Sequence, residues 1–157
     1  LKGSVEQYFS KGKYSTGYVA EAVFSNQPFF SNYMGTLVNM PAFYPMQDSR
    51  TLLLQNFRGF NYVAGGIRNV FSANNLLDIR LEGYFFKSIE ALNSQSDQSG
   101  SDFDFNYDVS FAATLGMVLH TPLGPVSLSA NYYDDAENEF GVLLHLGFLL
   151  HGDKSLE

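Results

Sequence analysis

Asp78, Arg80 and Glu82 are charged residues at alternate positions, and they are the first candidates for either acid–base catalysis or ion pairing. Residues two positions apart lie on the same face of a β-strand, so these side chains would form one row. Paired carboxylates are used in glycoside hydrolysis. The row also fits an ion-pair network with Arg58 or Arg68, because charges that point inward need partners. We therefore predict that these residues form an ion-pair network and take no part in catalysis.

Histidines and acidic residues are the other candidates for chemistry. His120, His145 and His151 fall on inner or end positions of the last predicted strands, where antiparallel neighbours would bring them together. They lack carboxylate partners at ligand spacing. The acidic run 134–139 offers oxygens for Ca²⁺, but it lacks the twelve-residue loop pattern and fits a solvated hairpin tip. We predict no metal site and no cofactor.

Composition excludes several classes of function. The chain has no cysteine, which removes disulfides, thiolate catalysis and cysteine zinc sites. It has no Gly-x-Ser-x-Gly nucleophile elbow, so we expect no enzyme in this chain. A net charge of −7 argues against nucleic-acid binding, which needs a basic surface. The apolar runs are too short for a transmembrane helix.

Alternation of apolar and polar residues is the main structural signal. From 103 to 119 every odd position is apolar and most even positions are polar or small, which is the period of a strand. An ordinary strand has five or six residues, whereas this pattern lasts about seventeen, long enough to cross a bilayer at a tilt. The same alternation continues over 126–133 and 140–150. Three long antiparallel strands, each with one apolar face, are predicted to end the chain.

Weaker patterns predict the earlier strands and their connections. Predicted strands cover 5–10, 14–24, 33–40, 51–57, 62–71 and 77–85. Turns are expected at 11–13, 72–75 and 121–125, and longer polar loops at 41–50 and 87–102. Short turns that alternate with long loops are typical of transmembrane barrels. Aromatic residues near strand ends would form a girdle at the membrane interface: Tyr84, Phe85, Phe86, Tyr132, Tyr133 and Phe140.

These patterns predict an all-β fold, an antiparallel up-and-down transmembrane β-barrel with about eight long strands in this chain. We see no domain boundary, so residues 1–157 would be a single barrel domain or a C-terminal barrel fragment. The chain begins with neither an initiator Met nor a signal peptide. We therefore expect it to be the C-terminal piece of a longer precursor.

The hairpin SFAATLGMVLHTPLGPVSLSANY, residues 110–132, resembles the closing hairpin of the bacterial surface-antigen superfamily. This superfamily comprises outer-membrane barrels, including assembly insertases and two-partner secretion pores. The resemblance assigns the turn of the hairpin to Thr121, Pro122, Gly124 and Pro125.

A second motif, NFRGF at 56–60, resembles the Arg-Gly-aromatic motif that the superfamily carries on a loop folded into the lumen. The resemblance therefore implies that Arg58, Gly59 and Phe60 lie inside the barrel. Residues 27–45 and the sequence IRLEGY at 79–84 are similar to the C-terminal barrel of Bacteroidetes-type patatin-like phospholipases.

These resemblances imply a sixteen-stranded barrel in the bacterial outer membrane, of which this chain supplies about half. It would act as a membrane anchor or translocation unit for an upstream domain, a patatin-like phospholipase. The implied partners are outer-membrane lipid, the upstream domain of the same precursor and the outer-membrane assembly machinery. Because an isolated half barrel has two unpaired edges, it would have to close on itself or pair with a second copy as a homodimer.

The alternative is a self-contained soluble eight-stranded β-barrel that binds a small apolar ligand. The two hypotheses differ in where the apolar faces point. A soluble barrel would have an apolar interior and would turn the polar faces outward, with Asp78, Arg80, Glu82, Asp104 and Asn106 in water. A membrane barrel would reverse this arrangement.

Overall fold

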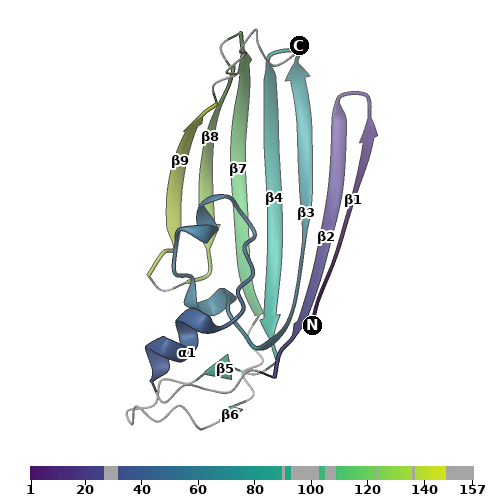
Figure 1. The fold of residues 1–157 in the computed structure, drawn as a ribbon. Helices are drawn as coiled ribbons and strands as arrows, with labels where there is room; N and C mark the ends of the chain where they lie inside the picture. Colours follow the sequence, from purple (N-terminus) through teal and green to yellow (C-terminus); the bar gives the residue numbers. More distant parts are fainter. Residues whose placement is uncertain are drawn as a thin grey trace, which may run out of the picture.

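The structure, a computed structural model, describes residues 1–26, 32–89, 91–92, 103–104, 109–122, 124–135 and 137–147. Within these residues seven antiparallel strands form one sheet, in which strands that follow each other along the chain are neighbours (Figure 1). They are β1 (Lys2–Lys11), β2 (Tyr14–Phe24), β3 (Asn61–Asn74), β4 (Leu77–Ser88), β7 (Val109–Thr121), β8 (Gly124–Tyr133) and β9 (Phe140–Leu146). The predicted all-β, antiparallel, up-and-down fold is confirmed. A second small sheet pairs β5 (Ala91–Leu92) with β6 (Phe103–Asp104).

The connections at the two ends of the sheet differ in length. Tight turns join β1 to β2, β3 to β4 and β7 to β8, at the upper end of the sheet in Figure 1. β2 and β4 end at the opposite end of the sheet, where the long connections to β3 and β7 begin. In the first turn Gly12 has a φ of 62°, a left-handed conformation that glycine adopts without a steric penalty. The predicted alternation of short turns and long loops is therefore confirmed.

The connection between β2 and β3 folds back over the sheet. It contains α1 (Tyr33–Asn39) and two 3₁₀ turns, η1 (Asp48–Arg50) and η2 (Gln55–Phe57). The strands predicted at 33–40 and 51–57 are therefore wrong. A helix forms because the Asn32 side chain caps it, accepting a hydrogen bond of 2.9 Å from the Met34 amide, and Pro41 follows its end. We call residues 32–60 the inner segment.

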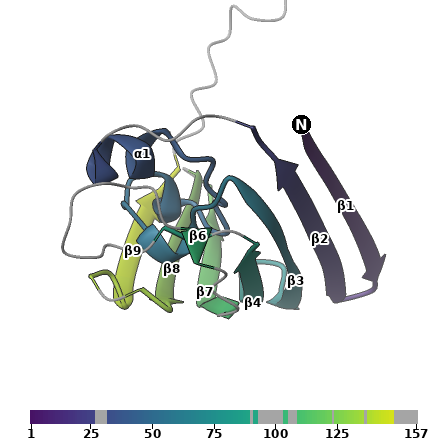
Figure 2. The same ribbon diagram turned by 90° about the horizontal axis from the view of Figure 1, so that it is seen from below.

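The inner segment defines two faces of the sheet. The covered face is called the inner face and the opposite one the outer face; seen from below, the sheet bends around the segment (Figure 2). A buried apolar core lies between the segment and the inner face. Its members from the segment are Phe43, Met46, Leu54 and Phe57, and those from the strands are Val23, Tyr62, Ala64, Tyr84, Phe86, Ala112 and Tyr133.

The sheet is open within the described residues. β1 and β9 are its two edges, and no pairing between them is found in this part of the chain, so the expected self-closure is not observed. Seven long strands are present where about eight were predicted; of the nine predicted strand ranges, those at 33–40 and 51–57 belong to the inner segment. Closure would need backbone hydrogen bonds between β1 and β9, and the strand order places the other five strands between these two edges.

The final strands are shorter than predicted. β7 begins at Val109, while Phe103–Asp104 belong to the small sheet, so the strand predicted over 103–119 is wrong in its first part. Its residues 105–108, including Asn106, lie outside the described residues, as do most of the loop predicted at 87–102 and the end of the strand predicted to reach 150.

Candidate functional site

The row Asp78, Arg80 and Glu82 lies on the inner face of β4, as the alternation predicted. Arg68 on β3 pairs directly with Glu82 in the strand register, and its Nε lies 3.7 Å from a Glu82 carboxylate oxygen. Arg68 also makes an ion pair with Glu6 of β1. Of the three residues in the row, Glu82 pairs with Arg68, whereas Asp78 pairs with His120 and Arg80 has no ion pair among the described residues, so the predicted network forms only in part.

Two tyrosines complete the contacts around Arg68. The Arg68 Nε donates a hydrogen bond of 2.6 Å to the Tyr84 hydroxyl, and its Nη1 donates one of 2.8 Å to the Tyr8 hydroxyl. The Tyr84 hydroxyl in turn donates a bond of 2.5 Å to Glu82. Each charge in this cluster thus has a partner, which is what a charge removed from bulk water needs.

Arg58 lies away from that network. Its Nη1 is within hydrogen-bonding distance of the carbonyl oxygens of Leu37, Val38 and Met40, at 3.1, 3.2 and 3.4 Å. These carbonyls belong to the last turn of α1 and to the residue after it, where carbonyls lack the usual amide partner four residues further on. The Leu37 carbonyl also accepts a bond of 3.3 Å from the Met40 amide. Arg58 therefore holds the C-terminal end of α1 inside the segment.

The other residues of the NFRGF motif are part of the packed segment. Phe57 is fully buried against Phe86 and Tyr133, with ring centroids 5.8 and 6.1 Å away. Phe60 is 4% exposed, and the Gly59 amide donates a bond of 3.0 Å to the Pro41 carbonyl. The motif thus lies on the inner side of the sheet.

The turn between β7 and β8 has the tight geometry that its sequence suggested. The Thr121 hydroxyl donates a hydrogen bond of 2.6 Å to the Gly124 carbonyl, and Gly124 has a φ of 134°. Side chains rarely adopt that conformation, so the position favours glycine. Pro122 is exposed, and Pro125 pairs with His120 across the two strands. A further strand, β9, follows this hairpin and forms the edge of the sheet.

The expectation that the histidines lack carboxylate partners is wrong for His120. Its Nε2 lies 2.8 Å from a carboxylate oxygen of Asp78, near the end of the sheet where the tight turns lie. His145 is on β9 opposite Ser127, and His151 lies outside the described residues. Among the residues that the structure describes, no His, Cys, Asp or Glu side chains are grouped as metal ligands.

The solvated hairpin tip predicted at 134–139 is wrong for Asp135. This residue is 5% exposed, and its carboxylate accepts hydrogen bonds from the amides of Asn56, at 3.2 Å, and Glu137, at 3.3 Å. Because the Asn56 side chain also donates a bond of 2.9 Å to the Asp134 carbonyl, the hairpin is tied to the inner segment.

Asp48 joins the middle of the inner segment to β8, a connection that the sequence patterns did not indicate. Its two carboxylate oxygens accept hydrogen bonds of 2.6 Å from the Asn131 side chain and 2.5 Å from the Tyr133 hydroxyl. Asn131 accepts a further bond of 2.6 Å from Thr114 on β7. In the sequence, Asp48 stands beside Ser49 in a proline-containing stretch. That composition predicts a turn and does not distinguish it from a contact with β8.

The predicted aromatic girdle is wrong for half of its members. Consecutive strand residues point to opposite faces, so the run at 84–86 and the pair at 132–133 are divided between them. Tyr84, Phe86 and Tyr133 are buried in the inner core, while Phe85 and Phe140 are exposed on the outer face and Tyr132 there packs on Phe140 at 5.2 Å.

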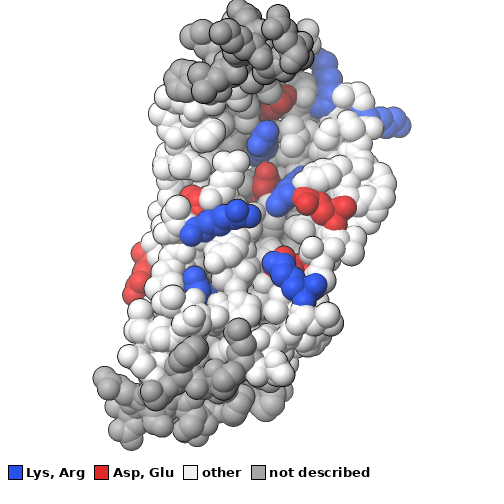
Figure 3. All heavy atoms as spheres, viewed as in Figure 1, with Lys and Arg blue, Asp and Glu red and all other residues white. Residues whose placement is uncertain are grey.

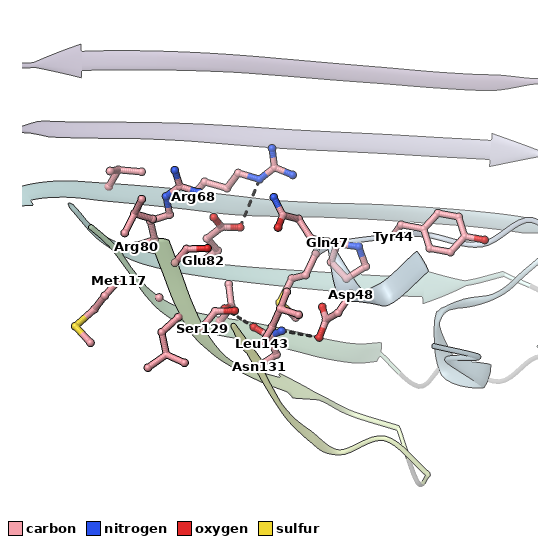
Figure 4. Close-up of a pocket in the computed structure, with 18 of the residues that line it drawn as sticks. Tyr44, Gln47, Asp48, Arg68, Arg80, Glu82, Met117, Ser129, Asn131 and Leu143 are labelled. Atoms are coloured by element: carbon pink, nitrogen blue, oxygen red, sulfur yellow. Dashed lines mark hydrogen bonds and ion pairs between the residues drawn. The ribbon is translucent and has the colours of Figure 1, made fainter. Parts of the chain in front are cut away.

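A cavity of about 610 Å³ opens on the inner face between the inner segment and the tight turns (Figure 4). The register explains its position. Residues that pair across neighbouring strands form rows, and the inner-face rows nearest the segment hold aromatic and small apolar residues. The next row toward the turns holds Arg68, Glu82, Thr114 and Asn131, and the row after it holds Arg80 and Ser129. Figure 3 shows charged side chains gathered along this hollow side of the molecule.

No protein family matches this sequence, and neither a curated protein nor a solved structure is similar to it. The resemblances to the surface-antigen superfamily and to patatin-like phospholipases therefore stay predictions. Among the described residues, no helix has both the length and the apolar character needed to cross a membrane. The site is thus defined by its geometry, as a polar cavity on the covered face of an open antiparallel sheet.

Proposed function

We propose that this chain forms the lipid-facing wall of an outer-membrane β-barrel. It would serve as the membrane anchor or the translocation unit of an attached domain. The observation that carries the proposal is the polarity of the sheet. Its outer face is apolar and exposed, and its inner face holds the charged side chains. A protein that folds in water places these faces the other way round.

The outer face supports the proposal in detail. One row crosses five strands with apolar side chains that are all exposed: Phe71, Ile79, Met117, Leu128 and Leu144. On the outer face of the seven strands the charged residues are Lys11 and Lys87, each at or next to a strand end. A large exposed apolar surface of this kind marks a site that contacts lipid or another protein.

The polar residues of the outer face are paired with one another. Asn69 accepts hydrogen bonds of 2.5 Å from the Tyr14 hydroxyl and 2.9 Å from the Thr16 hydroxyl. The Tyr18 hydroxyl donates one of 2.5 Å to the Gln7 side chain. Such pairing lowers the free energy of placing these groups in lipid, where no water replaces a missing partner.

Strand length also fits a membrane. Six of the seven strands of the sheet have between 10 and 14 residues. A tilted strand needs about 9–11 residues to cross the hydrocarbon core. Ordinary strands have about 5–6 residues, so strands of this length are unusual in a water-soluble sheet.

An open sheet cannot remain in lipid, because each unpaired backbone group at its edges costs several kcal/mol. The proposal therefore requires further strands against β1 and β9. The superfamily resemblance implies that they come from the same polypeptide, as part of a sixteen-stranded wall, and a second copy of the chain is the alternative source.

The attached domain is proposed from the resemblance to patatin-like phospholipases. A Gly-x-Ser-x-Gly segment and a signal peptide encoded upstream of this chain are the expected findings. Absence of the Gly-x-Ser-x-Gly segment from the complete coding sequence would remove the phospholipase part of the proposal and leave the wall untouched. Absence of a signal peptide would contradict the outer-membrane location itself.

The soluble ligand-binding barrel receives less support. It requires an apolar interior and polar residues outside, whereas Arg68, Asp78 and Glu82 lie on the inner face and Leu81 and Leu115 are more than half exposed on the outer one.

Arginine scanning along β7 tests the lipid-facing wall. Leu115 is at the middle of the strand and Leu119 near its end, both on the outer face. In lipid, Leu115→Arg should lower the free energy of unfolding by about 2–4 kcal/mol and Leu119→Arg by about 0–1 kcal/mol, because the cost depends on depth. Unfolding of the full chain in bilayers by denaturant measures both. Equal effects, within about 0.5 kcal/mol of the parent protein, would contradict a membrane wall.

A further inference from the structure

Arginines outnumber carboxylates in the lining of the cavity on the inner face, although Arg68 is also paired with Glu6, which lies outside the lining. Three arginines line it, Arg50, Arg68 and Arg80, against two carboxylates, Asp48 and Glu82. The whole chain has a net charge of −7, so this lining opposes the sign of the protein that surrounds it. The side chains come from both walls, since Arg50 ends η1 in the inner segment and the other two arginines lie on β3 and β4.

The two carboxylates of the lining are already engaged. Both oxygens of Asp48 accept hydrogen bonds, from Asn131 and Tyr133. Glu82 accepts from Tyr84 and lies next to Arg68. Figure 4 marks the contacts from Arg68 to Glu82 and from Asn131 to Asp48 with dashed lines. The lining acids therefore offer little further neutralisation to any other cation.

Arg50 and Arg80 are the cations that remain. Within the described residues neither has a carboxylate partner within 4.0 Å. Asp78, two residues from Arg80 on the same face, is hydrogen-bonded to His120 and interacts with Arg80 only at longer range. Two guanidinium groups thus border one cavity with their donors unoccupied by acids.

Small and hydroxyl side chains leave room beside Arg80. Gly116 lies opposite Arg80 in the register, with Ser129 beyond it on β8. A Cβ at Gly116 would meet its nearest atoms at 3.5 Å and the Arg80 Cβ at 3.9 Å, which is ordinary contact. The hydroxyls of Ser127 and Ser129 line the same space and can donate hydrogen bonds.

We propose that this cavity binds a phosphate-type oxyanion between Arg50 and Arg80. A guanidinium presents a planar fork of donors that matches phosphate and carboxylate oxygens. A single carboxylate is satisfied by one such fork, whereas a phosphate group carries close to two negative charges and additional oxygens, which suits two arginines. The inference does not depend on whether the outer face contacts lipid, since every residue involved is on the inner side.

The proposal is tested by titrating the full chain with inorganic phosphate at low ionic strength and measuring binding by isothermal titration calorimetry. We expect saturable binding that Arg80→Gln and Arg50→Gln each weaken at least tenfold. Gly116→Leu, which fills the space beside Arg80 without removing a charge, should weaken it as well. Lys11→Gln removes one positive charge on the outer face and should leave the affinity unchanged.

Sodium acetate provides the second arm of the experiment. Acetate should bind at least tenfold more weakly than phosphate. The proposal is overturned if phosphate does not bind at millimolar concentration, if the Arg50 and Arg80 variants bind it like the parent protein, or if acetate binds equally well. Circular dichroism of each variant confirms that the sheet is retained, and the charge-neutral Gly116 variant decides the outcome if an arginine variant fails to fold.

Discussion

Asp48 and Asn131 are 83 residues apart in the sequence, and the Asn131 side chain donates a hydrogen bond of 2.6 Å to the Asp48 carboxylate. Asn131 is 4% exposed and lies on the inner face of β8, while Asp48 opens the first 3₁₀ turn of the inner segment. The other Asp48 oxygen accepts from the fully buried Tyr133. This pair fixes the inner segment above the sheet and sets one wall of the cavity.

Removal of this carboxylate should loosen the inner segment. Asp48→Ala leaves the Asn131 amide and the Tyr133 hydroxyl without their acceptor, and an unsatisfied buried donor costs about 1–3 kcal/mol. We expect that loss in the free energy of unfolding, together with faster proteolysis within residues 41–60. Asp134→Ala is the control, because that side chain is exposed and its backbone carbonyl makes the contact with Asn56. Equal behaviour of the two variants would contradict the role of Asp48.

Two neighbouring glycines should respond in opposite ways to alanine. A Cβ at Gly66 would overlap the buried Tyr84 ring and lie 2.7 Å from the Gly83 carbonyl oxygen, whereas a Cβ at Gly83 meets nothing within 4 Å. Gly66→Ala should therefore cost about 1–3 kcal/mol through overpacking. Gly83→Ala should stabilise the strand by about 0.5–1 kcal/mol, because glycine loses more backbone entropy on folding. Chemical denaturation of both variants measures the difference, and a neutral Gly66→Ala would show that the inner face is not packed as described.

The open sheet predicts which edges can be linked. The chain has no cysteine, so introduced pairs have no background. Cysteines at Ala130 and Val142, which are Cα partners on β8 and β9, should be joined by a short cross-linker within one molecule. Cysteines at Val5 in β1 and Val142 in β9 should not, since they lie on opposite edges. Mass spectrometry distinguishes links within a chain from links between chains. An efficient link from Val5 to Val142 in one molecule would mean that the sheet closes on itself, and a link between two molecules would favour edge pairing of copies.

The local pattern of the sequence by itself determined most of the seven long strands and their two faces, although it also predicted two strands that do not form. Strict alternation over β4, β7 and β8 decides which side chains share a face, because strand residues alternate regardless of what covers them. The turns at Gly12 and Gly124 were also readable, since only a few residue types tolerate their backbone conformations. The shared row of Asp78, Arg80 and Glu82 follows from the same rule.

Three features were decided only by the tertiary structure, because each depends on contacts between residues that are distant in the sequence. The stretch 33–40 was predicted as a weak strand, yet it forms a helix that Asn32 caps and whose last carbonyls Arg58 binds. The partner of Glu82 proved to be Arg68 and not Arg58, since strand register, which no local pattern specifies, placed Arg68 opposite it. The inner segment covers the sheet because its apolar side chains pack against residues from five strands, and that packing depends on the whole core at once.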